Sequence, residues 1–173
     1  MATSLSVDIK ASLTWLQADA LDLSTISDNA KLEFDKSTAN GTGADQADLL
    51  WHDQRAVAAA SNDDLDLTAL ASTIFGSAVT VNMAKVRGLL ILNTSTTSGE
   101  VLRVGGAGAG SALASPFNGD VDAVVEVGPD SCLMLSNKKD GWAVTAGTGD
   151  ILRIANPNAA SVTYQIAIVG TSV

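Results

Sequence analysis

The feature that most constrains this chain is an alternation of apolar and polar residues with a period of two. Leu5, Val7 and Ile9 alternate with polar residues, and Leu32 and Phe34 do the same. Two later runs follow the same rule, at Val121, Ala123, Val125 and Val127 and at Val162, Tyr164, Ile166 and Ile168. Successive side chains of a strand point to opposite faces, so each run predicts a strand with one face on a core.

The spacing of turn residues predicts how these strands are arranged. Residues 86–92 are apolar nearly throughout and predict a central strand buried on both faces. Turn sequences occur at residues 40–41, 128–130, 140–141, 147–149 and 156–158. Short strands with such regular turns are typical of a sandwich or barrel. We therefore expect a mainly β chain, an antiparallel β-sandwich or jelly roll over 1–173 as a single domain, with at most one or two short helices.

Two segments leave helix and strand in competition. Asp66 could cap a helix that ends at Gly76. The shared face of this helix would consist of Leu67, Leu70, Ala71 and Ile74. The alanine content of residues 45–60 also favours a helix, whereas residues 55–67 fit strands equally well.

Composition limits the partners that the surface can bind. Hydrophobic residues make up 46% of the chain, aromatic residues 4% and charged residues only 17%. Small neutral polar groups are cheaper to desolvate than ions, which suits packing against copies of the chain or another protein. The net charge of −9 disfavours binding to nucleic acid or to an anionic membrane, because both are recognised by lysine and arginine.

The residues that catalysis and metal binding need are scarce. The chain has one histidine, His52, and one cysteine, Cys132, which lies in an apolar run and is predicted to be a small core residue. One of each makes neither a zinc site nor a convincing triad. A single cysteine also fits a chain folded in a reducing cytoplasm. We predict that the protein is not an enzyme and has no cofactor and no metal, although calcium or a glycan at a loop stays open.

The glycine-rich segment 105–111 invites comparison with phosphate-binding loops. It lacks the lysine of a P-loop and the glycine spacing of a dinucleotide fingerprint. We expect it instead to let two backbone segments approach closely or to form an exposed tip.

Two groups of residues are candidates for an interface. Residues 51–55 read Trp-His-Asp-Gln-Arg and predict either a local hydrogen-bonded and packing cluster or an interface patch that includes His52, with Trp51 as anchor and Arg55 as polar contact. Leu5, Val7 and Ile9 form the second group. They lie in residues 1–11, a candidate N-terminal arm that could pair with a neighbouring sheet edge or form an ordinary first strand.

The order of several segments resembles small virion structural proteins of tailed bacteriophages. These segments are 51–55, 63–67, 85–93, 102–106, 141–150 and 164–170, and the resemblance runs from about Leu5 to the C-terminus. It implies a decoration or cement protein on the outer capsid surface of the virion, made in the host cytoplasm. Such proteins often form trimers and clamp neighbouring capsomers. The expected partners are the major capsid protein and copies of the chain itself as a homo-oligomer, with trimer favoured.

Three other roles compete with capsid decoration. A phage fibre or receptor-binding module would use loops such as 105–111 to touch host glycans. A tail or neck subunit would be found in tail fractions of broken virions. A polysaccharide-cleaving enzyme would use a pair of carboxylates, which the sequence does not single out.

Overall fold

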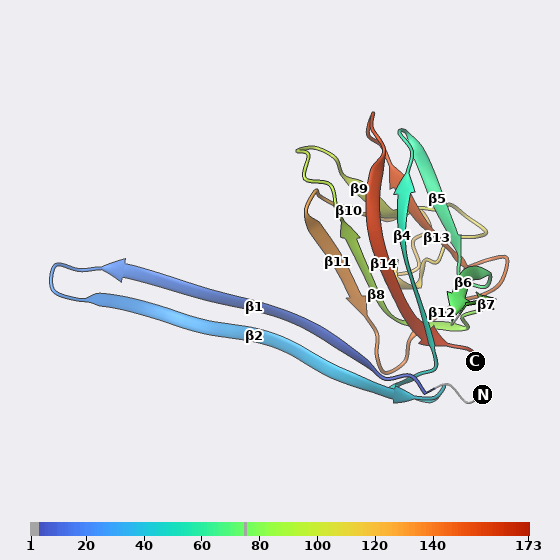
Figure 1. The fold of residues 1–173 in the computed structure, drawn as a ribbon, viewed down its shortest axis with the longest axis horizontal. Coiled ribbons are helices and arrows are strands. Elements are labelled where there is room, and N and C mark those ends of the chain that lie inside the picture. Colours follow the sequence, from blue (N-terminus) through green and yellow to red (C-terminus); the bar gives the residue numbers. More distant parts are fainter. Residues whose placement is uncertain (1–3, 75) are drawn as a thin grey trace.

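The computed structural model describes residues 4–74 and 76–173, which are almost entirely β (Figure 1). Its only helical element in these ranges is the 3-10 turn η1 (Ser115–Phe117). The mainly β prediction is confirmed. The strands are β1 (Val7–Ala20), β2 (Thr25–Asn40), β3 (Gln46–Ala47), β4 (Leu49–Val57), β5 (Ser61–Asp66), β6 (Leu70–Ile74), β7 (Ser77–Val81), β8 (Lys85–Asn93), β9 (Leu102–Gly105), β10 (Val124–Val127), β11 (Ser131–Ser136), β12 (Trp142–Ala143), β13 (Ile151–Asn156) and β14 (Val162–Thr171).

Two antiparallel sheets form the body of the molecule. The larger has the order β11-β8-β14-β4, with β12 also paired to β8, and the smaller has the order β10-β9-β13-β5. Buried side chains of both sheets meet in one core, among them Trp51, Val86, Ile91, Ile166 and Ile168 from the larger and Leu65, Leu102, Val104, Leu152 and Ile154 from the smaller. The body is therefore a β-sandwich.

The path of the chain through these sheets is that of a jelly roll. Its first long body strand, β4, pairs with the last, β14, and β5 pairs with β13. Leaving aside the hairpin of β6 and β7 and the two-residue β12, the chain between them changes sheet at every step except the central hairpin of β9 and β10. An eight-stranded double sheet with this pairing of early and late strands is the jelly-roll arrangement.

The segments left open between helix and strand are both strands. Residues 45–60 contain β3 and β4, and residues 66–76 contain the end of β5 and all of β6, so the predicted helix is wrong. Asp66 does act as a capping residue, but it caps a turn and not a helix. Its Oδ1 accepts hydrogen bonds from the backbone N–H of Thr68 at 2.8 Å and from its hydroxyl at 2.6 Å.

Strand β8 has the central position predicted for residues 86–92 but not the predicted burial on both faces. It lies between β11 and β14, as a central strand should. Val86, Leu89 and Ile91 are buried in the core, whereas Leu90 and Leu92 are only half-buried on the other face. The segment is therefore buried on one face and not on both.

The glycine-rich segment begins with a close backbone approach, as predicted. A Cβ at Gly105, whose φ is +107°, would lie 2.4 Å from the carbonyl oxygen of Ala123. Gly108 and Gly110 face open space. Within the described residues, no helix has both the length and the apolar character needed to cross a membrane.

Candidate functional site: the hairpin arm, its root and the sheet face beside it

Strands β1 and β2 form a long hairpin that leaves the body and projects away from it (Figure 1). Fourteen consecutive cross-strand pairs run from Val7 opposite Thr38 to Ala20 opposite Thr25. At roughly 3.3 Å per residue the ladder is about 45 Å long. We call residues 7–40 the arm. An isolated two-stranded ribbon is at best marginally stable in water, so a structure of this length requires support along one face.

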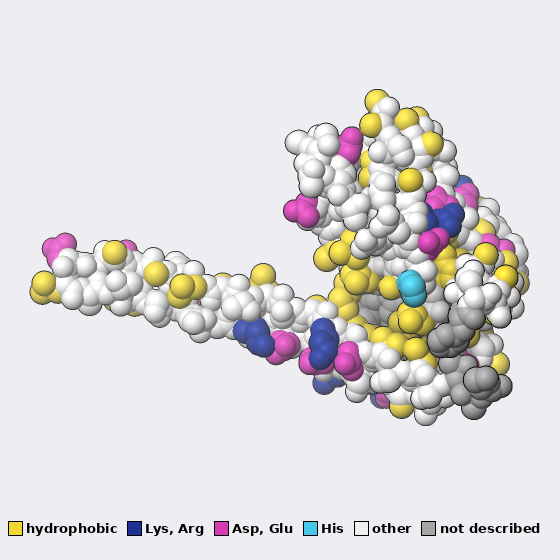
Figure 2. Space-filling model, in the orientation of Figure 1, with side chains coloured by type: hydrophobic (Ala, Val, Ile, Leu, Met, Phe, Trp, Pro, Cys, Tyr) yellow, Lys and Arg dark blue, Asp and Glu magenta, His cyan; other side chains and the backbone are white. Residues whose placement is uncertain are grey.

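The two faces of the arm differ in polarity. On one face Leu13 stands opposite Leu32 and Ala11 stands opposite Phe34. Leu13 is 66% exposed and Leu32 is 70% exposed. We define the apolar face of the arm as Val7, Ile9, Ala11, Leu13, Trp15, Ile26, Ala30, Leu32 and Phe34. Six of these nine residues are exposed, all except Val7, Ile9 and Ala30. Hydrophobic side chains are visible at several points along the arm in Figure 2. The polar residues Gln17, Asp19, Asp28, Lys36 and Thr38 lie on the same side of the ribbon.

Polar residues and ion pairs occupy the opposite face. Lys10 lies 3.1 Å from Asp35, and this hydrogen-bonded partner raises the pKa of the lysine. Lys31 lies 2.5 Å from Glu33. Leu16, which is 67% exposed, is an apolar exception on this face. The arm is thus an amphipathic ribbon whose polar face is suited to water and whose apolar face is not.

The tip of the arm is apolar and acidic. The backbone N–H of Leu21 donates to the carbonyl of Ser24 at 2.7 Å and closes the turn, where Leu23 is fully exposed. The indole N–H of Trp15 donates to Asp28 at 3.2 Å. Residues 11–30 contain three aspartates and no lysine or arginine, so the distal part of the arm carries only negative charge.

The root of the arm packs on the larger sheet through a glycine. A Cβ at Gly88 of β8 would lie 3.3 Å from Cδ1 of Ile9, so the bare glycine gives the isoleucine room to approach the sheet. Ile9 is consequently buried, with 6% exposed. The hydroxyl of Thr38 also donates to the carbonyl of Val7 at 3.3 Å. The apolar face of the arm therefore meets the outer face of the sheet at this point.

A buried arginine holds the root from the other side. Arg87 is 1% exposed, and its Nη2 donates to the carbonyl of Gly43 at 2.9 Å. Its Nη1 donates to the carbonyls of Lys138 and Lys139. Lys138 in turn lies 2.8 Å from Asp45 and lowers the pKa of that carboxyl through their hydrogen bond. These contacts fasten the turn that follows the arm to the β11–β12 loop.

Next to the root, the outer face of the larger sheet is also apolar. Side chains that alternate away from the core include Leu90, Leu92, Cys132, Met134, Ala167, Val169 and Leu50, with His52 beside them. We call this group the sheet face. Figure 2 shows hydrophobic side chains gathered where the arm joins the body, next to the single histidine. The predicted burial of Cys132 in the core is wrong: its side chain is exposed because the run alternates, and Leu133 takes the inward position.

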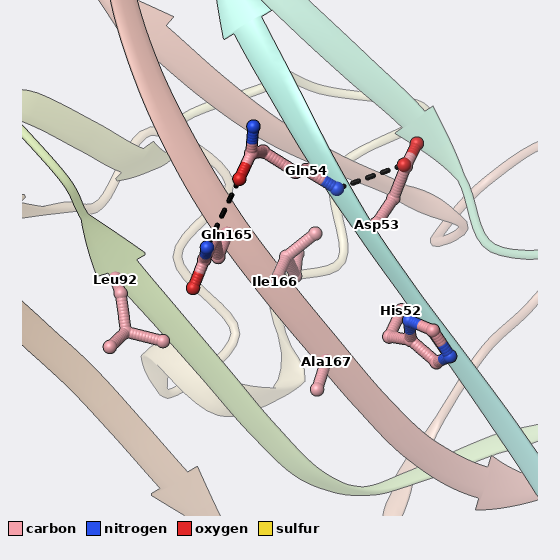
Figure 3. Close-up of a pocket in the computed structure, with 7 residues that line it drawn as sticks. All are labelled: His52, Asp53, Gln54, Leu92, Gln165, Ile166 and Ala167. Carbon is pink, nitrogen blue, oxygen red and sulfur yellow. Dashed lines mark hydrogen bonds between the residues drawn. The ribbon is translucent and has the colours of Figure 1, made fainter.

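Two hollows mark the sheet face and its edge. The first, of about 290 Å³, is lined by His52, Leu92, Ala167 and the pair Gln54 and Gln165, whose amides are hydrogen-bonded at 3.1 Å (Figure 3). The second, of about 1050 Å³, lies between the edge strand β4 and the hairpin of β6 and β7. Both hollows are shallow surface features bordered by strands.

The predicted interface residues lie in several different environments. Leu5 lines the second hollow, and Val7 and Ile9 begin the arm. His52 is exposed on the sheet face. Trp51 is buried, with its indole N–H donating to the carbonyl of Ala71 at 2.9 Å, so it packs in this chain's own core. The arm is also much longer than the predicted segment 1–11, of which residues 1–3 lie outside the described residues.

Arg55 belongs to an ion pair that links the two sheets. Its Nε lies 2.6 Å from Oδ2 of Asp63, and its Nη2 donates to Oδ1 at 2.9 Å. The hydroxyl of Tyr164 donates to the same carboxylate at 2.8 Å. Burial would raise the pKa of Asp63, but hydrogen bonds from Arg55 and Tyr164 outweigh it and hold the pKa below its usual value. These hydrogen bonds join the two sheets, so Arg55 has the environment of the local hydrogen-bonded cluster that was one of the two alternatives for residues 51–55.

Comparison with known proteins found no matching family model, no matching curated protein and no matching solved structure. Among the described residues, no group of three or more histidine, cysteine, aspartate or glutamate side chains is arranged to hold a metal ion. The arm and the sheet face are therefore the surfaces from which a function can be argued.

Proposed function

We propose that this chain is a structural protein of a tailed-phage virion that decorates and stabilises the outer surface of the capsid. The observation that carries the proposal is the arm. About a fifth of the chain, residues 7–40 of 173, forms a ribbon whose apolar face, beyond its root at Ile9, is left exposed by the described residues. Exposed apolar surface on this scale usually marks a binding site for another protein.

Other features of the molecule support this proposal. Jelly rolls occur in viral capsid domains, although the fold alone does not specify a function. The acidic surface, with a net charge of −9, suits a protein that sits outside the shell and away from packaged DNA. The resemblance of the sequence to phage virion proteins points the same way.

Binding to empty expanded capsids tests the proposal. Purified protein is expected to sediment with the shells in hundreds of copies per particle and to raise the temperature at which they disrupt. A variant with Leu13→Asp and Leu32→Asp, which charges the apolar face, should lose binding. The matched control Thr14→Asp lies on the polar face opposite Lys31 and should retain it. Absence of both binding and stabilisation by the unaltered protein would exclude capsid decoration.

A receptor-binding module is the second candidate, because jelly rolls also serve as lectin domains. Gly108 and Gly110, where an added Cβ would meet open space, would then belong to a loop that meets a glycan. Copy number separates the two roles. A gel of purified virions should show a decoration protein in hundreds of copies and a receptor-binding module in few.

A further inference from the structure

We propose that the apolar face of the arm docks on the sheet face of a second copy of this chain. The inference deepens the proposed function by naming the partner of the arm, and it rests on the arm having a structural role. Both surfaces that would make the contact, the apolar face of the arm and the sheet face, are present in every copy of the chain.

The root of the arm shows the mode of contact. Ile9 already packs its side chain on Gly88, at one end of the sheet face. Ala11, Leu13 and Trp15 continue the same row of the arm, but they have left the sheet and are exposed. The exposed residues of the arm therefore continue a row of side chains whose member Ile9 already packs on this sheet.

The arm cannot cover the sheet face of its own molecule. Its ladder is continuous over fourteen pairs with no register shift, so it has no bulge at which to fold back. It points away from the body instead (Figure 1). The arm of a second copy approaches from outside and does not have to fold back to reach the sheet face. Residues 11–20 span about 33 Å, the same length as the ten-residue strand β14 that crosses the sheet face.

The exposed apolar area of the arm is a substantial part of what a stable contact between two copies needs. A fully exposed apolar side chain offers roughly 60–120 Å². Leu13, Trp15, Leu21, Leu23, Ile26, Leu32 and Phe34 are 40–100% exposed. Together they offer the equivalent of about four fully exposed side chains, or about 240–480 Å². In reciprocal exchange each copy would contribute its arm and its own sheet face, and both surfaces would count toward the ~800 Å² per partner of a standard interface.

The exposed Cys132 provides a reporter on the sheet face. We would introduce a single cysteine at position 11, 13 or 15 of the apolar face and oxidise the full-length protein at micromolar concentration. The matched controls are Ser12→Cys and Thr14→Cys on the opposite face of the same strand. The proposal predicts disulfide-linked dimers on a non-reducing gel for at least one apolar-face position and few for the controls. Two cysteines join only when their Cα atoms are within about 7 Å, so a link reports that the arm lies close to Cys132. Cys132→Ser should therefore abolish the link, because it removes the partner of the new cysteine.

Light scattering on the unmodified protein completes the test. The proposal predicts an oligomer that Leu13→Asp with Leu32→Asp converts to monomer, while Thr14→Asp leaves it assembled. Circular dichroism and thermal melting check that each variant is folded. A monomeric native protein, equal cross-linking on both faces, or a link that persists without Cys132 would each overturn the inference.

The outcomes also separate this inference from the proposed function. A monomer that still binds capsid shells would mean that the arm docks on the capsid protein, so the decoration role would stand and the self-docking would fail. An oligomer that binds no shells would support the self-docking and exclude capsid decoration.

Discussion

Neutralising Asp63 is the sharpest test of how the two sheets are held together. Its carboxylate accepts two hydrogen bonds from Arg55 and one from Tyr164. Asp63→Asn keeps the shape of the side chain and removes its charge. Arg55 then retains only Asp53, at 3.1 Å, as an anionic partner.

The expected loss can be estimated from these contacts. A hydrogen bond to a charged group contributes about 1.5–3 kcal/mol net. The Arg55 side chain is 36% exposed, so water replaces part of what is lost. The amide oxygen also still accepts one hydrogen bond. We therefore expect Asp63→Asn to lower the free energy of unfolding by about 2 kcal/mol at neutral pH.

The dependence on pH provides an independent check. The pKa of Asp63 in the folded protein lies below the ordinary value of 3.8, so the folded state binds this proton less readily than the unfolded state. The carboxylate thus stabilises the fold above the unfolded pKa, and its contribution disappears as the pH falls through the folded pKa. The difference between the native protein and Asp63→Asn should be largest near neutral pH and should shrink in acid.

Urea denaturation at neutral and acidic pH measures both quantities. The matched control is Asp64→Asn on the same strand, where the carboxylate is 41% exposed and pairs with Arg153 at the surface. That substitution should cost less than about 1 kcal/mol. The reasoning would be refuted if both substitutions had the same effect, or if the loss from Asp63→Asn did not change with pH.

Three further predictions concern the packing of the body and the root of the arm. Gly170→Ala should destabilise the protein by about 2 kcal/mol or more in thermal unfolding, because the new Cβ would lie 2.2 Å from the carbonyl oxygen of Lys85. Arg87→Met should release the root, seen as faster amide hydrogen exchange in residues 41–47 with the core strands unchanged. The thiol of Cys132 should react with a soluble disulfide reagent in folded monomeric variants, and an unreactive thiol there would contradict its exposure.

The sandwich was predictable because its signal is local. Alternation at Val162–Ile168 reports one buried face directly, and turn sequences such as Gly128-Pro129-Asp130 fall between β10 and β11 as expected. Alternation over several residues is the pattern of a strand with two different faces, so repeated runs of this kind indicate a chain built from strands. The mainly β architecture follows from this pattern alone.

The arm was only partly predictable because alternation does not say what covers a face. Leu32 and Phe34 have the pattern of a core strand, yet they are 70% and 41% exposed. The same limit explains Cys132, which lies in an apolar run but points away from the core. A pattern of side chains gives the two faces of a strand, and only tertiary structure shows which face meets the rest of the molecule.

Helix propensity misled at residues 66–76 for a different reason. Asp66 has the side chain of a helix cap, but its carboxylate closes a turn onto Thr68, after which Leu70 enters β6 and is buried. Capping residues stabilise turns and helices by the same hydrogen bond, so the sequence does not distinguish them.

The unbroken register of the arm has an evolutionary consequence. Adding or removing one residue in either strand would turn every side chain beyond that point to the opposite face. The apolar row would then be split between the two faces. Length changes that keep the row intact must come as two residues in each strand, which shift the tip by about 7 Å per step. Among related chains, we expect arms whose lengths differ in these steps, so that the reach of the arm changes in discrete increments.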